Sequence, residues 1–132
     1  MDLGLAGKNA VITGSTRGIG RAIANLLADE GTNLAICSRN QEEVDSAVAE
    51  LSAKGVKVTG AVVDVADKAS YQAWIASVGE ELGGIDIFVP NVSAGGGNMS
   101  EEGWEANFNI DLLGTTRGVE AAMPFLEKSS AA

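Results

Sequence analysis

A glycine-rich segment close to the N-terminus carries the clearest chemical signal in this sequence. It reads Thr13-Gly-Ser-Thr-Arg-Gly-Ile-Gly20, with an apolar strand predicted before it at residues 9–13 and a helix after it at residues 19–28. Glycines let the backbone approach a ligand closely, and the unpaired amides and dipole of a helix N-terminus favour an anion. The segment therefore predicts a cradle for a nucleotide phosphate, formed by Gly14, Ser15, Thr16, Arg17, Gly18, Ile19 and Gly20.

A tight turn without a ligand is the alternative interpretation of these glycines. A P-loop is excluded, because no Gly-Lys-Ser or Gly-Lys-Thr closes the motif. The position of the segment between a strand and a helix, with a basic residue inside it, favours a dinucleotide.

Two arginines bear on which dinucleotide this cradle would accept. Arg17 lies within the glycine-rich segment, and Arg39 follows the second apolar strand, predicted at residues 33–37. Proteins that select NAD usually place an acid at the end of that strand for the ribose hydroxyls, whereas the 2′-phosphate of NADP needs a cation. No acid occurs there before Glu42, and two guanidinium groups can clamp a phosphate. This corner predicts NADP(H) in preference to NAD(H), with two solvated surface arginines as the alternative.

Four apolar strands and the helices between them must position these residues. The remaining strands are predicted at residues 57–63 and 85–89, and a second helix at residues 41–54. A third helix is expected to begin at the cap Asp67 and to bury Tyr71, Trp74, Ile75 and Val78. Right-handed crossovers then give one α/β domain of the Rossmann type over residues 1–132, with strand order 3-2-1-4. The site is expected at the switch point between the first and fourth strands.

Composition limits the classes of function. The chain of 132 residues is 45% hydrophobic without any apolar run of membrane-spanning length, so we expect a soluble, cytoplasmic protein and no membrane partner. A net charge of -9 argues against nucleic acid as a partner. The absence of His excludes Ser-His-Asp hydrolysis and most zinc sites. The single Cys37 lies in a predicted strand, where it is expected to be buried.

The spacing Gly-x-x-x-Gly-x-Gly resembles the cofactor motif of the classical short-chain dehydrogenases/reductases, and the resemblance runs from about Leu5 to the end of the chain. It implies that Asp64 and Val65 contact adenine, although an Asp at a strand end is also a common turn residue. Residues 85–91 resemble the family's Asp-hydrophobic-Val-Asn-Asn-Ala-Gly segment, which implies that Asn91 contributes to the cofactor site. Residues 104–114 resemble the start of its long interface helix.

Some positions depart from the family pattern. Pro90-Asn91 stands where the family usually has two Asn, and Val92-Ser93 stands where it has Ala-Gly. Asp111 falls where the family carries the Asn of its catalytic tetrad, which makes it the candidate catalytic residue. Its spacing from Trp104 and Phe108 predicts that all three share an inward stripe of the helix.

The resemblance implies an NADP(H)-dependent oxidoreductase that acts on a carbonyl or alcohol. The family's catalytic Ser and Tyr-x-x-x-Lys pair have no counterpart in these 132 residues, because the one tyrosine, Tyr71, is followed four positions later by Ile75. We therefore expect the cofactor-binding half of a reductase, inactive as an isolated chain and able to take a substrate only with a C-terminal half. The alternative is a dinucleotide-binding module that acts by association. A complete flavodoxin-like or receiver domain ranks last, because the fifth strand and an acidic cluster after the first strand are missing.

The predicted fourth strand would leave one edge of the sheet open. The helix that follows adds the apolar residues Phe108, Leu112, Val119, Met123 and Leu126. An open sheet edge and an apolar surface both favour pairing between copies. The sequence therefore predicts a homo-oligomer.

Overall fold

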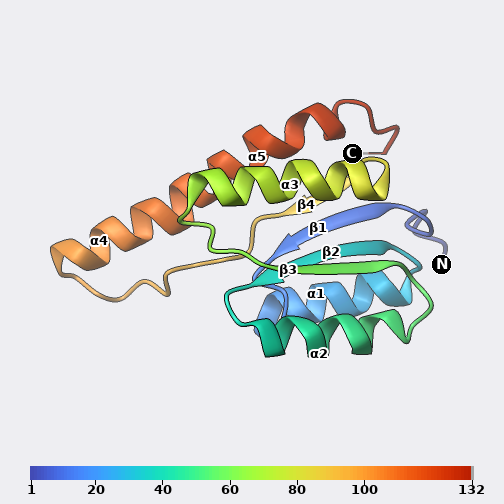
Figure 1. Ribbon diagram of the computed structural model, residues 1–132, viewed down its shortest axis with the longest axis horizontal. Coiled ribbons are helices and arrows are strands. Elements are labelled where there is room, and N and C mark those ends of the chain that lie inside the picture. The colour runs from blue at the N-terminus through green and yellow to red at the C-terminus, as the bar shows by residue number, and fades with distance from the viewer. Residues whose placement is uncertain (132) are drawn as a thin grey trace.

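The computed structural model describes residues 1–131 and places a parallel four-stranded sheet between two layers of helices (Figure 1). The strands are β1 (Asn9–Thr13), β2 (Asn33–Ser38), β3 (Val58–Val62) and β4 (Ile87–Val89), in the order β3-β2-β1-β4. The predicted Rossmann-type fold and strand order are confirmed. A flavodoxin-like or receiver domain has the order 2-1-3-4-5. That alternative is therefore wrong.

Helices cover both faces of the sheet. Helices α1 (Gly18–Asp29) and α2 (Gln41–Ser52) lie on one face, and α3 (Lys68–Leu82) and α5 (Leu113–Leu126) lie on the other (Figure 1). Along β1, Ala10 and Ile12 pack in the core with α1 and α2, whereas Val11 packs in the core with α3 and α5. Successive strand residues face opposite sides of a sheet, so a strand covered on both faces must be apolar throughout.

Side-chain caps mark the start of three helices. Asn40, Asp67 and Ser100 accept hydrogen bonds from backbone amides in the first turns of α2, α3 and α4 (Glu101–Asn107), respectively. Such caps satisfy amides that have no acceptor within the helix. The predicted cap Asp67 is confirmed. At α1, in contrast, the N-cap Arg17 makes no side-chain hydrogen bond among the described residues.

Helix α4, the π-helical segment η1 (Phe108–Leu112) and α5 follow one another, and α4 extends beyond the sheet (Figure 1). Trp104 and Phe108 are 62% and 53% exposed, so the predicted inward stripe is wrong for both. The reason is that, among the described residues, no other layer of the chain covers the side of α4 and η1 that carries these residues. The buried face of α5 is made of the small residues Gly114, Gly118 and Ala122.

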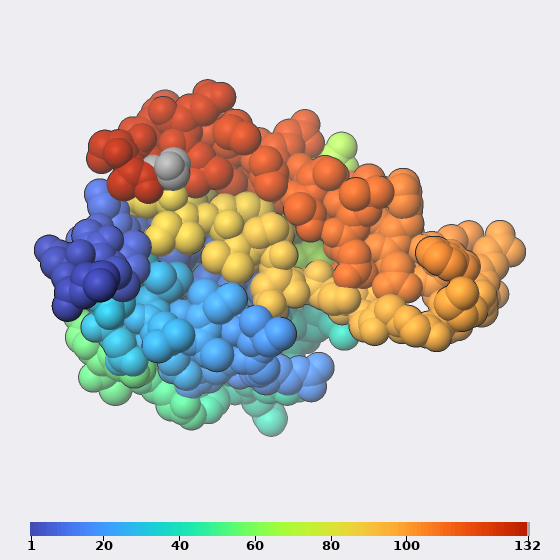
Figure 2. Space-filling model, turned by 180° about the vertical axis from the view of Figure 1, so that it is seen from behind, coloured from blue at the N-terminus to red at the C-terminus, as the bar shows by residue number. Residues whose placement is uncertain are grey.

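Strand β4 is the edge of the sheet and is shorter than predicted. It begins at Ile87, although Ile85 is already buried and the Asp86 amide donates to the Asn9 carbonyl at 2.9 Å. Figure 2 shows the β4 segment, in yellow, on the molecular surface between α1 and α5. Across residues 1–131, no helix combines the length and the apolar character that a membrane crossing requires.

Candidate functional site

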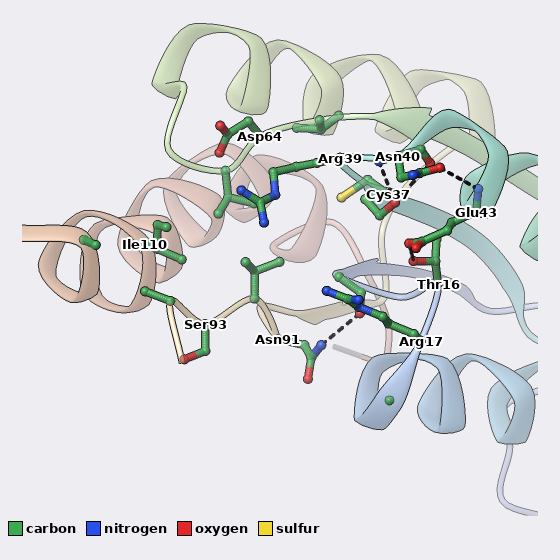
Figure 3. A pocket seen from close by; sticks show the side chains of 18 residues that line it. Thr16, Arg17, Cys37, Arg39, Asn40, Glu43, Asp64, Asn91, Ser93 and Ile110 are labelled. Atoms are coloured by element: carbon green, nitrogen blue, oxygen red, sulfur yellow. Dashed lines mark hydrogen bonds between the residues drawn. The ribbon is translucent and has the colours of Figure 1, made fainter. Parts of the chain in front are cut away.

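A cavity of about 810 Å³ opens where the carboxyl ends of the strands meet (Figure 3). Its wall consists of the segments that follow the four strands, closed on one side by Ala106 and Ile110. Eight of the predicted cofactor residues line it: Gly14, Thr16, Arg17, Gly18, Arg39, Asp64, Val65 and Asn91. The wall does not include Ser15, Ile19, Gly20 or Asp111. The cavity lies at the switch point of the sheet, where α/β folds place their ligands.

The glycine-rich segment turns sharply from β1 into α1. Gly14 and Gly18 have φ values of 63° and 60°, in the left-handed region that favours glycine. A Cβ on Gly20 would overlap the Gly14 carbonyl oxygen, so Gly20 lets the helix approach the turn. Ile19 is 75% exposed, and its backbone amide lies in the first turn of α1.

Ser15 and Asn91 brace this turn against the neighbouring strands. The buried Ser15 hydroxyl donates to a β1 carbonyl at 2.7 Å and accepts from the Cys37 amide of β2 at 3.2 Å. After β4, the Asn91 amide donates to Thr13 Oγ1 at 3.0 Å, and Asn91 Nδ2 donates to the Gly14 carbonyl at 3.1 Å. Ser15 therefore acts from the interior, whereas Asn91 both braces the turn and lines the cavity.

Arg17 and Arg39 extend into the cavity from the start of α1 and the end of β2 (Figure 3). Sequence reasoning identified both but missed a carboxylate among them. Glu43, in the first turn of α2, also lines the cavity and accepts a hydrogen bond from the Thr16 hydroxyl at 3.0 Å. The cap Asn40 three positions earlier would suggest a different partner for Glu43, the amide of the cap residue itself, so no local pattern points to this contact.

Asp64 and Val65 lie where β3 ends. Asp64 Oδ1 accepts a hydrogen bond from the Ala66 amide at 2.9 Å. Asp64 is therefore a turn residue, which was the alternative to an adenine contact in the sequence analysis. Its side chain is exposed at the cavity wall, and Val65 beside it is buried. The same residue can therefore hold the turn and face a ligand.

Asp111 lies in η1 and holds the loop that follows β4. Its Oδ2 accepts from the Ala94 amide at 3.0 Å, and Asn107 Oδ1 accepts from the Gly96 amide at 3.2 Å. Asp111 is partly buried, and its neighbour Ile110 lines the cavity. The carboxylate thus fixes the position of the loop beside the cavity.

Two residue types that often carry proton transfer are buried here. Burial raises the pKa of Cys37 to about 12, and burial also raises the pKa of Tyr71. Both groups therefore stay protonated at neutral pH. Within residues 1–131, no group of three His, Cys, Asp or Glu side chains is arranged to hold a metal ion. The cavity therefore offers backbone amides, two guanidinium groups and two carboxylates, which bind and orient a ligand.

Comparisons with known proteins agree with this geometry. The sequence is 37% identical over 129 residues to isoepoxydon dehydrogenase patN of Penicillium expansum, covering 96% of this chain and 50% of that protein. The structure is similar to L-sorbose reductase from Gluconobacter frateurii complexed with NADPH and L-sorbose, with a TM-score of 0.89 and 34% identity over 96% of this chain and 50% of the reductase. It is also similar to carveol dehydrogenase from Mycobacterium avium in complex with NAD, with a TM-score of 0.85 and 28% identity over 92% of this chain and 50% of that chain.

These relatives are about twice as long as this sequence, so the chain spans about half the length of the curated relatives it matches. The short chain dehydrogenase family profile matches residues 8–132. Together with the parallel sheet and its strand order, this match shows that the chain belongs to the short-chain dehydrogenase/reductase family.

Proposed function

We propose that this chain binds a nicotinamide dinucleotide and forms the cofactor-binding part of an oxidoreductase that acts on an alcohol or carbonyl. One observation carries the proposal: the uncapped start of α1 and the glycine turn face a cavity at the switch point of the sheet. Amides without a capping partner, aligned with a helix dipole, suit the pyrophosphate of a dinucleotide. The NADPH-bound and NAD-bound relatives support the same ligand class.

The residues that line the cavity fit different parts of such a cofactor. The backbone around Gly14 and Gly18 would hold the pyrophosphate, and Asp64 and Val65 would bind adenine at the end of β3. Asn91 would keep the glycine turn in place during binding. A bound nicotinamide would supply or accept the hydride, while these side chains orient the cofactor and limit its access to water. The proposal of an alcohol or carbonyl substrate rests on family membership alone.

NADP(H) is the preferred form in this proposal. Arg17 and Arg39 extend into one cavity, and a guanidinium pair can bind the 2′-phosphate through charge-assisted hydrogen bonds. NADPH should therefore bind more tightly than NADH by roughly 1 to 3 kcal/mol. NAD(H) remains the less favoured ligand.

The Arg39→Asp variant tests both the site and its preference. The introduced carboxylate repels a 2′-phosphate and accepts from the ribose hydroxyls, so the order of affinities should reverse in favour of NADH. Fluorescence titration of each dinucleotide against the 132-residue chain measures this order. Lys128→Asp changes the net charge equally at an exposed position outside the cavity wall and should leave the order intact. Binding of neither dinucleotide by the unmodified chain would contradict the proposed function, and equal affinities would contradict only the arginine clamp.

A further inference from the structure

The cavity wall contains, besides the two arginines, a carboxylate next to the glycine turn. Glu43 lines the cavity together with Arg17 and Arg39. Figure 3 shows Glu43 beside Thr16 and near Arg17, whereas Ser93 and Ile110 lie at the opposite end. Glu43 therefore lies on the side of the cavity formed by the glycine turn and the start of α2, away from the loop that follows β4.

Two hydrogen bonds fix the position of Glu43. Its amide donates to the cap Asn40 Oδ1 at 3.0 Å, and its Oε2 accepts from Thr16 Oγ1 at 3.0 Å. In a capping box, a glutamate at this position would instead bond the amide of the cap residue. Here the Asn40 amide donates to Ser38 Oγ at 3.2 Å. The Glu43 side chain is thus available to reach across to the glycine turn.

The charges that line the cavity oppose one another. Among the described residues, the charged side chains of the wall are Arg17 and Arg39, which are basic, and Glu43 and Asp64, which are acidic. The positive potential of the two arginines is therefore weakened by the carboxylates that the fold holds in the same cavity wall. In a partly exposed cavity this effect is modest, because water and salt screen the interaction.

A carboxylate at this position distinguishes the two nicotinamide dinucleotides. A ribose 2′-hydroxyl can donate a hydrogen bond to Glu43, as the Thr16 hydroxyl already does. A 2′-phosphate carries between one and two negative charges at neutral pH and presents acceptor oxygens, so it gains nothing from a carboxylate and is repelled by it. We propose that Glu43 is a cofactor-specificity residue that lowers the preference for the 2′-phosphorylated dinucleotide set by Arg17 and Arg39. This inference rests on the proposed function, because it requires nicotinamide dinucleotides to bind in this cavity.

The test compares Glu43→Gln with Glu42→Gln in the 132-residue chain. Gln at position 43 keeps an acceptor for the Thr16 hydroxyl and removes only the charge. Glu42 is an exposed residue in the same turn of α2 and is not part of the cavity wall, so its substitution controls for net charge and for the helix dipole. Fluorescence titration gives the affinities of NADPH and NADH for each protein, at low and at physiological salt.

Glu43→Gln should raise the NADPH-to-NADH affinity ratio by roughly two- to ten-fold, with the larger change at low salt. Glu42→Gln should leave the ratio unchanged to within about a factor of two, because exposed charges outside the site interact weakly. If circular dichroism shows that Glu43→Gln does not fold, Glu43→Ala takes its place, and the same rise is expected. An unchanged or lower ratio in a folded Glu43 variant overturns the role of Glu43 while leaving the proposed function standing. Binding of neither dinucleotide by the unmodified chain overturns both.

Discussion

At the scale of single residues, Cys37 shows how burial decides what a reactive side chain can do. It lies in β2, fully buried beneath the cavity, and burial raises its pKa from the ordinary value of 9.0 to about 12. The thiolate is the reactive form of cysteine, so a thiol held in this state is a poor nucleophile. Cys37 therefore contributes packing to the sheet, as the sequence predicted.

The raised pKa of Cys37 has a consequence for stability at alkaline pH. Because the folded state disfavours the thiolate, the contribution of this thiol is complete below about pH 9 and is lost as the pH rises toward about 12. The loss amounts to about 1.4 kcal/mol per pH unit within that window. Urea unfolding at pH 8 and pH 10 should therefore show a larger loss of stability in the unmodified chain than in Cys37→Ala, by about 1 kcal/mol.

The Cys37→Ala comparison cancels the other groups that titrate in this range. Tyr71, whose pKa burial also raises, and the lysines are present in both proteins. Equal losses of unfolding free energy in the two proteins would show that the Cys37 thiol ionises as easily in the folded state as in the unfolded chain.

At the scale of elements, the close contact between α3 and α5 depends on glycine. A Cβ on Gly118 would overlap the Tyr71 hydroxyl and lie against the Phe88 ring. One turn earlier, a Cβ on Gly114 would meet Val65 Cγ2 at 3.5 Å, an ordinary van der Waals distance. Both glycines are buried on the same face of α5, yet only Gly118 lacks room for a side chain.

These two glycines make a matched pair of substitutions. Gly118→Ala should destabilise the chain by roughly 1 to 3 kcal/mol, because Tyr71 or Phe88 must move. Gly114→Ala should be neutral or stabilising by up to about 1 kcal/mol, since alanine favours helix and fits the available space. Thermal and urea unfolding measure both effects. Equal stability of the two variants would mean that α5 shifts away from α3 at little cost.

The elements that the sequence predicts best are those packed on both sides. The apolar run at residues 9–13 is found as β1 with the same bounds, because a continuous apolar strand fits only between two layers of helices. For the exposed Trp104 and Phe108 the prediction is wrong. Helical spacing indicates that apolar residues share a face, but it does not indicate whether any other element covers that face.

The candidate site was predictable to the extent that its residues follow the ends of strands. The glycine turn, Arg39 and Asn91 are of this kind, because parallel strands bring their carboxyl ends to one edge of the sheet. Glu43 was missed because its partner Thr16 lies 27 residues away, on another element. That contact depends on how α2 packs beside the glycine turn, which helical periodicity does not specify.

At the scale of the whole molecule, this chain has both an open sheet edge and exposed apolar side chains. Strand β4 is the outer strand. Helix α4, the segment η1 and helix α5, together called the rod, expose four apolar residues that we call the patch: Trp104, Phe108, Leu112 and Met123. Leu126, which the sequence placed in this patch, packs against the core. An unpaired edge strand and exposed apolar side chains both favour association between copies. The net charge of -9 opposes association weakly, because salt screens it over about 8 Å.

We therefore expect the 132-residue chain to self-associate through the rod and the β4 edge. Sedimentation velocity over a concentration series should show a mass that rises above that of the monomer. Leu112→Lys, at a residue 52% exposed within the patch, should shift the equilibrium toward monomer. Leu26→Lys makes the same change on α1, at a residue 67% exposed outside the patch, and should leave association intact. A monomer at every concentration would show that neither the strand edge nor the apolar patch binds a second copy with measurable affinity. Equal weakening of association by both lysine substitutions would show that the contact lies outside the patch or is nonspecific.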